Sequence, residues 1–186
     1  LLFEEQHLER LTKASRYFSF PFDPEELRQK IEKECQACDF HQDYRLRITL
    51  SKSGEMELSR QILTPLSPSF CKAKLCLQEA DLQTPFTYFK TTHRPHLSLG
   101  EQEIIYHNVA GDLLETSIGN LVLKINGKLY TPPTSQGILP GIYRQHLLET
   151  GQVKEKIMTL EDLNQAEAIY GCNAVRGLYE LEVNPK

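Results

Sequence analysis

The stretch "EIIYHNVAGDLLETSIGNLVLKINGKLYTPP", residues 103–133, predicts consecutive β-strands joined by tight turns. Apolar and β-branched residues fill its strand segments. The triplets "AGD" (110–112) and "NGK" (126–128) supply the glycines that hairpin turns favour. The second half of the chain is therefore predicted to be built around these strands.

Two helical signals follow the strands. The stretch "GILPGIYRQHLLETG" (137–151) predicts a helix that begins after Pro-Gly and stops at Gly151. Thr159 and Asp162 form a variant of the capping box, which predicts another helix start. A short strand is predicted near residues 168–172.

The first half begins with two predicted helices. Apolar residues recur at helical spacing over the first twenty positions, and Asp23 with Pro24 gives a second helix its cap and first residue. Residues 44–63, "YRLRITLSKSGEMELSRQIL", alternate around Ser-Gly and predict a β-hairpin. The stretch "KAKLCLQ" (72–78) predicts one more strand.

The order of these elements predicts a mixed α and β fold with two α/β subdomains. We place the first subdomain over residues 1–86 and the second over residues 87–186. The chain has 40% hydrophobic and 25% charged residues, as ordinary globular proteins do.

Charge and hydropathy exclude several classes of partner. The net charge is −4 and there is no long basic run, which argues against a nucleic-acid partner. No apolar stretch approaches the roughly 20 residues that span a bilayer, and the first residues do not resemble a signal peptide. We therefore predict a cytoplasmic protein.

Five cysteines fit reduced thiols better than a disulfide framework. Cys35, Cys38 and His41 have zinc-like spacing, but no second pair completes a site. Thiols at a helix end are the better explanation, so we predict no metal site.

Four features of the second half are candidates for catalysis or for binding an anion. Lys90 lies in "TYFKTTHRPH" (87–96), where apolar bulk and nearby cations favour an amine nucleophile, and we expect it at the end of a strand. Glu115 lies where a strand enters a sharp turn. The helix start in "LPGIYRQ" and the small residues of "CNAVRG" each offer backbone N–H groups to an anion. Taken singly, each has a structural explanation, and a lysine is usually a solvated surface charge.

Together the blocks "HLERL", "KTTHR", "LLETSIGNL", "LPGIYRQ" and "CNAVRG" resemble the fold-type IV pyridoxal-phosphate enzymes, which include branched-chain and D-amino-acid aminotransferases and aminodeoxychorismate lyases. The resemblance covers nearly the whole chain. The stretches "RYFSFPFD" and "FKTTHR" are most similar to the lyase domain found at the C-terminus of bifunctional aminodeoxychorismate synthase (para-aminobenzoate synthase component I) chains. The resemblance implies a D-amino-acid-aminotransferase-like fold and pyridoxal 5'-phosphate as cofactor.

The resemblance also implies roles for particular residues. It assigns Lys90 as the catalytic lysine that carries the cofactor and moves protons, and Glu115 as the partner of its pyridine nitrogen. Phosphate binding is assigned to Arg10, Ile142, Tyr143, Asn173 and Ala174. From the residues alone, a surface ion pair with Glu5 or Glu9 is the better explanation of Arg10.

The implied activity is conversion of 4-amino-4-deoxychorismate to 4-aminobenzoate and pyruvate, a step of folate precursor synthesis. Arg45 and Arg47 share one strand face and are candidates for binding a substrate carboxylate, although an exposed hairpin face explains them equally well. The alternatives are an aminotransferase of the same fold and a non-catalytic module that stabilises a synthase partner.

The chain departs from the family pattern in two places. It starts late, so the N-terminal strands that line the substrate pocket are absent, and we expect a fragment of a longer chain. The link between the motifs of Lys90 and Glu115 is short, and Pro95 stands where the family continues with a helix. By resemblance we expect a homodimer, with a fused or associated synthase domain as a further partner.

Overall fold

The protein, described by a computed structural model over residues 1–79 and 83–183, divides into two compact units. The first unit is Leu1–Pro65 and the second is Leu66–Lys186. This boundary lies earlier than the expected one at residue 86. The reason is strand β3 (Lys72–Leu77), which pairs with strands of the second unit and with none of the first.

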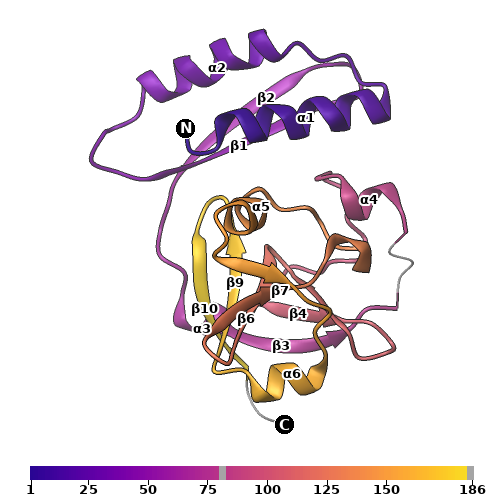
Figure 1. The fold of residues 1–186 in the computed structure, drawn as a ribbon. Coiled ribbons are helices and arrows are strands. Elements are labelled where there is room, and N and C mark those ends of the chain that lie inside the picture. The colour runs from indigo at the N-terminus through magenta and orange to yellow at the C-terminus, as the bar shows by residue number, and fades with distance from the viewer. Residues whose placement is uncertain (80–82, 184–186) are drawn as a thin grey trace. The chain divides into compact units, whose positions relative to one another are not determined.

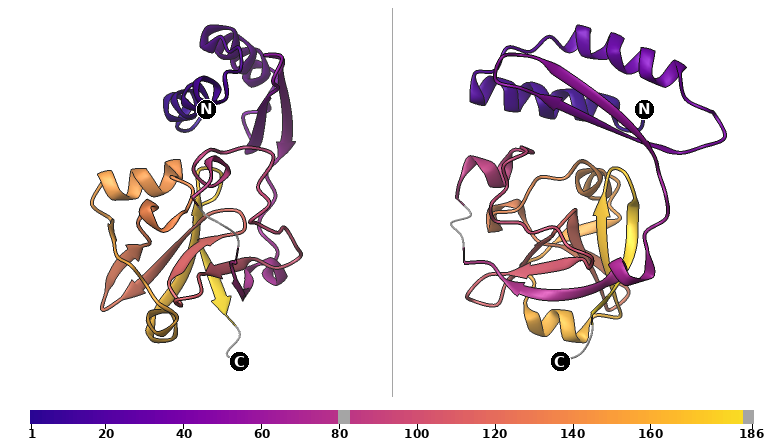
Figure 2. Two further views of the ribbon diagram at one scale, coloured as in Figure 1. Left: turned by 90° about the vertical axis from the view of Figure 1, so that its right-hand side faces the viewer. Right: turned by 180° about the vertical axis from the view of Figure 1, so that it is seen from behind.

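The first unit contains two helices and a hairpin, as predicted. Helices α1 (Glu4–Phe18) and α2 (Pro24–Gln36) precede the antiparallel strands β1 (Tyr44–Leu50) and β2 (Met56–Ile62). The Asp23 carboxylate accepts hydrogen bonds from the backbone N–H groups of Glu25 and Glu26, which confirms it as the cap of α2. Both helices lie along one face of the hairpin (Figure 2).

Alternation along the hairpin separates its two faces. The apolar face packs on the helices around a small core of Leu8, Leu27, Ile31 and Met56. Because side chains of a strand point alternately to opposite faces, Arg45 and Arg47 lie on the other face of β1, and both are exposed. Burial of one face therefore determines the register of the hairpin.

The second unit has the following elements, drawn in Figure 1: α3 (Pro68–Cys71), β3, α4 (Pro85–Tyr88), β4 (Ile104–His107), β5 (Leu113–Thr116), β6 (Asn120–Ile125), β7 (Lys128–Thr131), a 3-10 helix (Thr134–Gln136), α5 (Ile142–Glu149), β8 (Val153–Glu155), α6 (Leu160–Gln165), β9 (Ala168–Asn173) and β10 (Gly177–Val183). The helix start at Thr159 and the helix ending before Gly151 are confirmed. The stretch that predicted the strands forms β4 to β7.

The sheet of the second unit closes on itself at β5, the strand that contains Glu115. The strands run in the order β5-β4-β3-β10-β9-β6-β7-β8, and β5 also pairs with β6. The first six strands in this spatial order, from β5 to β6, therefore form a closed barrel, and β7 and β8 extend from β6. The pair that closes it is Glu115 with Asn120, on either side of a sharp turn. Its core includes Ile105, Leu113, Leu121, Leu123 and Met158, each fully buried.

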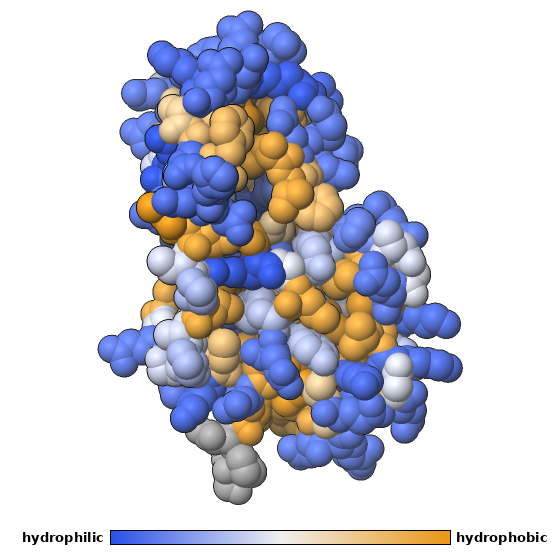
Figure 3. All heavy atoms as spheres, turned by 90° about the vertical axis from the view of Figure 1, so that its left-hand side faces the viewer, coloured by the Kyte–Doolittle hydropathy of each residue, from blue (hydrophilic) through white to orange (hydrophobic). Residues whose placement is uncertain are grey.

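The two predicted hairpin turns are confirmed. Gly111 has φ +85°, and Asn126 and Gly127 have φ +50° and +71°, a region that glycine and asparagine adopt most readily. Apolar side chains also reach the surface among polar ones (Figure 3), and Phe40, Leu99 and Val109 are largely exposed. Within residues 1–79 and 83–183, none of the helices has the length and apolar content needed to cross a membrane.

Candidate active site

Glu115 is a buried acid at the end of β5. Only 3% of the residue is exposed. The turn that follows is held by the Thr116 backbone N–H, which donates to the Gly119 carbonyl at 2.9 Å, and by the Gly119 N–H, which donates to Thr116 Oγ1 at 3.0 Å. Gly119 is required there, because a Cβ atom at this position would lie 2.5 Å from the Cys172 carbonyl oxygen.

Two donors contact the Glu115 carboxylate directly. Arg94 Nη2 donates to Oε1 at 3.0 Å, and the Leu139 backbone N–H donates to Oε2 at 3.4 Å. Burial raises the pKa of Glu115 to about 7, against the opposing effect of the Arg94 guanidinium, the Leu139 N–H and the Lys90 charge. The acid is therefore held near its protonation midpoint at neutral pH.

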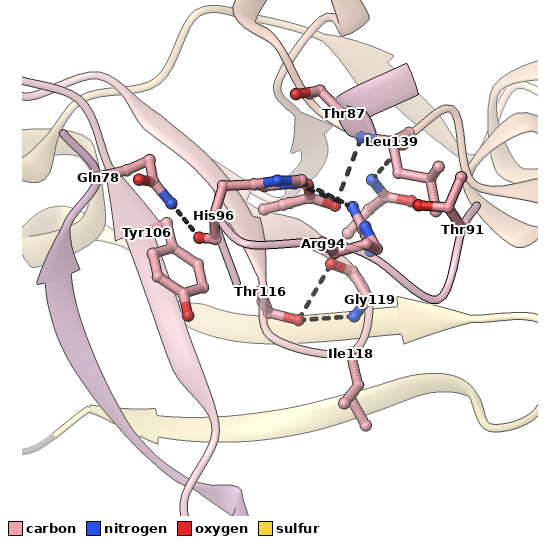
Figure 4. Close-up of polar contacts among 12 residues, drawn as sticks. Gln78, Thr87, Thr91, Arg94, His96, Tyr106, Thr116, Ile118, Gly119 and Leu139 are labelled. Atoms are coloured by element: carbon pink, nitrogen blue, oxygen red, sulfur yellow. Dashed lines mark hydrogen bonds and ion pairs between the residues drawn. The ribbon is translucent and has the colours of Figure 1, made fainter. Parts of the chain in front are cut away.

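His96 lies beside this pair as a neutral ring. Burial, and then the charge of Arg94, lower the pKa of His96 to about 4. Its Nε2 lies 3.5 Å from Arg94 Nη2 and 3.8 Å from Glu115 Oε1. Because arginine has no acceptor atom, His96 Nε2 accepts and the ring proton lies on Nδ1. Figure 4 shows Arg94 and His96 side by side, with Gln78 donating to the His96 carbonyl.

Lys90 is placed differently from expectation. It lies after the short helix α4, one residue beyond the helix-ending Phe89, and not at the end of a strand. Pro85 starts this helix and the chain then turns before β4 begins. The side chain is exposed. Its positive charge lowers the pKa of Glu115, so the amine lies within electrostatic range of that carboxylate.

The start of α5 is tied to the same turn. Asn120 Nδ2 donates to the Leu139 carbonyl at 2.8 Å, while the Leu139 N–H contacts Glu115. Gly141 is the N-cap, and among the described residues no side chain caps this helix. A Cβ atom on Gly141 would lie 2.0 Å from Asn120 Oδ1, so only glycine permits this approach. Ile142, the first helical residue, is buried, and Tyr143 is half-buried.

The second predicted phosphate turn follows β9. Asn173 Oδ1 accepts from the backbone N–H groups of Val175 and Arg176, at 3.0 and 2.9 Å, which folds the turn around its side chain. Asn173 Nδ2 donates to the Ile118 carbonyl at 3.4 Å. Asn173 and Ala174 are both half-buried. The turn is thus connected to the one that follows Glu115.

Three candidate arginines belong to the first unit. Arg10 lies on α1, where its Nη2 is 3.3 Å from His7 Nδ1. The acids expected as its surface partners pair elsewhere, Glu5 with Arg28 and Glu9 with Lys13. The other two, Arg45 and Arg47, are exposed on the polar face of β1.

The cysteines are all free, and Cys172 is buried. Within the part of the chain that the structure describes, no three histidine, cysteine, aspartate or glutamate side chains lie close enough to hold a metal ion. The zinc-like spacing of Cys35, Cys38 and His41, which all lie in that part, therefore does not assemble a metal site.

Sequence reasoning missed the residues that surround Glu115. Arg94 and His96 are in the quoted stretch around Lys90, but they appeared there only as neighbouring cations. Asn120 lies in the block "LLETSIGNL" that carries Glu115, but it was given no role there. No local periodicity identifies these three, because their contacts with Glu115 and Leu139 cross from one segment to another.

The chain is similar to several known proteins in sequence and in fold. A probable branched-chain-amino-acid aminotransferase of Thermotoga maritima is 26% identical over 89% of this chain, which spans 66% of that relative, slightly less than two thirds. A candidate amino-acid aminotransferase structure from Mesorhizobium loti is 27% identical with a TM-score of 0.82, over 97% of this chain and 91% of its own. A candidate 4-amino-4-deoxychorismate lyase structure from Haemophilus somnus is 25% identical with a TM-score of 0.72, over 92% and 88%.

The family profile "Amino-transferase class IV" matches residues 1–181, nearly the full chain. Enzymes of this family depend on pyridoxal phosphate. The mixed α and β fold agrees with that match. The chain belongs to the class IV aminotransferase family.

Proposed function

We propose that this chain binds pyridoxal 5'-phosphate through Lys90 and eliminates pyruvate from 4-amino-4-deoxychorismate to give 4-aminobenzoate. The observation that carries the proposal is the buried Glu115 carboxylate, lying within electrostatic range of the exposed Lys90 amine. The pyridine ring of the cofactor needs an acid that keeps its nitrogen protonated, and its aldehyde needs an amine with which to bond. A buried acid near a lysine supplies both.

The residues present fit this cofactor. Lys90 supplies an accessible amine, and Glu115 supplies an acid withdrawn from water. The start of α5 adds helix-terminal N–H groups without a capping side chain among the described residues, an arrangement that suits a phosphate. Ile142 and Tyr143 would provide these groups, with Asn173 and Ala174 contributing the adjoining turn. Arg10 is assigned to the phosphate by resemblance alone.

The bound cofactor supplies an electron-withdrawing ring that lowers the cost of removing a proton beside the substrate nitrogen. Glu115 would hold the ring nitrogen through a charge-assisted hydrogen bond. The Lys90 amine, displaced by the amine of the substrate, would take the proton from the carbon that bears nitrogen. Arg94 would keep Glu115 oriented, since it contacts Oε1 and leaves Oε2 to the weaker Leu139 contact.

The reaction balances without an oxidant or reductant. One C–H bond and one C–O bond of the substrate break, and the ring becomes aromatic. The departing enolpyruvate takes up the proton and becomes pyruvate. Formation of the aromatic ring drives the elimination forward.

An aminotransferase of the same fold is the second candidate, and two relatives favour it: the proteins from Thermotoga maritima and Mesorhizobium loti described above. Lys90 and Glu115 serve both reactions, so they do not discriminate. The lyase is preferred because "RYFSFPFD" and "FKTTHR" resemble the lyase domain. The structures from Haemophilus somnus and Mesorhizobium loti do not discriminate, since each is similar over nearly the whole of both chains.

The test begins with the cofactor. Purified chain is incubated with pyridoxal phosphate, reduced with borohydride and digested, and the modified peptide is identified by mass spectrometry. We expect modification at Lys90 and its loss in Lys90→Ala. Lys128→Ala, which removes another exposed lysine, is the matched control and should leave the modification unchanged.

The activity is then measured in two assays. Pyruvate release from aminodeoxychorismate, dependent on Lys90, supports the lyase. Amination of branched-chain keto acids without pyruvate release would replace it by the aminotransferase. Absence of cofactor binding in the wild-type chain would leave the non-catalytic module as the function.

The expected partners remain part of the proposal. We propose a homodimer and a fused or associated synthase domain, on the resemblance to synthase chains alone. Arg45 and Arg47 are proposed as contacts for a substrate carboxylate, supported by their exposure on one face of β1.

A further inference from the structure

A second buried acid, Glu103, lies next to the candidate site and has no part in the proposed reaction. It immediately precedes β4 and is fully buried. Its backbone is fixed on both sides, because its N–H donates to the Phe70 carbonyl and its carbonyl accepts from the Lys74 N–H. Burial of an acid is costly unless its oxygens are hydrogen-bonded.

Three donors meet the Glu103 carboxylate. Ser117 Oγ and the Ile118 backbone N–H donate to Oε1, the latter at 3.2 Å. Tyr179 Oη donates to Oε2 at 3.0 Å. Ser117 Oγ in turn accepts from the Ile104 N–H at 3.3 Å, which leaves its own proton for Glu103. Burial, and then the charge of Glu103, raise the pKa of Tyr179, so its hydroxyl remains a donor.

These donors hold the turn that follows Glu115. Ser117 and Ile118 form its middle, and the Ile118 carbonyl accepts from Asn173 Nδ2. The peptide units of Ile118 therefore join Glu103 on one side to the Asn173 turn on the other. Figure 4 shows Ile118 between Thr116 and Gly119, whose mutual hydrogen bonds close the turn.

The same turn separates the two residues that close the barrel. Glu115 precedes it and Asn120 follows it, and Asn120 holds the Leu139 carbonyl ahead of α5. Movement of the turn would thus shift the carboxylate, the start of α5 and the Asn173 turn together. An apolar side chain at position 103 would fill the space but would leave three donors without acceptors.

We propose that Glu103 is a positioning residue for the cofactor site, which it acts on by fixing the Ser117–Gly119 turn through Ser117, Ile118 and Tyr179. The inference rests on the proposed function, because it assumes that Glu115 and the Asn173 turn hold the cofactor. It predicts that weakening this network loosens cofactor binding without removing any group that touches the cofactor.

The experiment compares Glu103→Gln and Tyr179→Phe with Thr131→Val in the full chain. Glutamine keeps the shape but replaces one acceptor oxygen by a donor, and phenylalanine removes one hydroxyl. Thr131→Val is the matched control, since Thr131 is fully buried on β7 and its Oγ1 donates to the Leu121 carbonyl at 2.8 Å, outside this network. Melting temperature, pyridoxal phosphate affinity and amide hydrogen exchange are measured for each.

We expect all three variants to melt at lower temperature, but only the two network variants to bind pyridoxal phosphate about tenfold more weakly. Amide exchange at Ile118 and Gly119 should accelerate in Glu103→Gln and stay unchanged in Thr131→Val. The inference is overturned if the network variants bind like wild type, or if Thr131→Val weakens binding equally. Failure of the wild-type chain to bind the cofactor would overturn the proposed function and this inference together. Normal binding by the wild type and by both network variants would overturn this inference alone, so the two failures can be told apart.

Discussion

Arg94 Nη2 lies 3.0 Å from Glu115 Oε1, and the two side chains are only 13% and 5% exposed. Water stabilises these two buried charges little, so each charge is stabilised mainly by its partner. Arg94 Nε has no hydrogen-bond partner among the described residues, so the guanidinium contacts Glu115 through Nη2 and not through Nε. Arg94 therefore favours the charged form of Glu115, against the larger opposing effect of burial.

Arg94→Met should destabilise the chain by about 3 kcal/mol at alkaline pH, because it leaves a buried carboxylate without its cation. The loss should be smaller at pH 5, where Glu115 is protonated and needs no partner. Urea unfolding at both pH values measures it. Arg28→Met removes an exposed arginine that pairs with Glu5 and should change stability little. Equal effects of the two variants would contradict this view of Arg94.

The pH dependence of cofactor-free stability should carry the signature of Glu115. Its folded pKa, about 7, lies above the ordinary value of 4.5. The folded chain therefore holds a proton that the unfolded chain has released between these values, so stability falls as pH rises from 4.5 to 7 and levels off above. The loss is about 3 kcal/mol at most, by linkage.

Glu115→Gln should remove this fall. The measurement is the free energy of unfolding at a series of pH values, as the difference between wild type and variant. A difference that stays constant from pH 4.5 to 8 would show that burial does not raise the pKa of Glu115.

Gly141→Ala should displace the start of α5, because its Cβ would meet Asn120 Oδ1 at 2.0 Å. Overpacking of this kind costs about 1–3 kcal/mol, and pyridoxal phosphate affinity should fall with it. Gly151→Ala is the control at the other end of the same helix. There φ is +70° and nothing lies within 4 Å, so strain should cost about 1 kcal/mol with affinity unchanged. Equal affinities of the two variants would place the phosphate away from α5.

Thiol labelling should separate the cysteines. Cys172 is buried, and burial raises its pKa to about 12, whereas Cys76 is exposed. Because the thiolate is the reactive form, a short pulse of iodoacetamide should modify Cys76 and spare Cys172. Mass spectrometry of the digest measures the labelling of each cysteine. A urea-unfolded sample, in which both cysteines react, is the control. Labelling of Cys172 in the folded chain would mean that β9 opens readily.

Local sequence was sufficient for most elements. The cap at Asp23, the capping box at Thr159 and the hairpin turn at Gly127 depend on side chains a few residues apart, so their patterns identify them before any fold is known. Strand β3 was also predicted, but its partners were not. Parallel pairing with β4 and β10 depends on long-range packing, and through it the second compact unit begins at Leu66, before the predicted boundary.

The sequence by itself determined the strands, the helix ends and the order of motifs that places the chain in its family. Only the tertiary structure decided what surrounds Glu115, because two separate segments, one with Arg94 and His96 and one with Leu139, meet at its carboxylate. It also showed that Glu103 accepts the donors of the turn after Glu115. Short-range patterns specify backbone conformation, whereas the desolvation and pairing of a charge depend on which distant side chains fill the space around it.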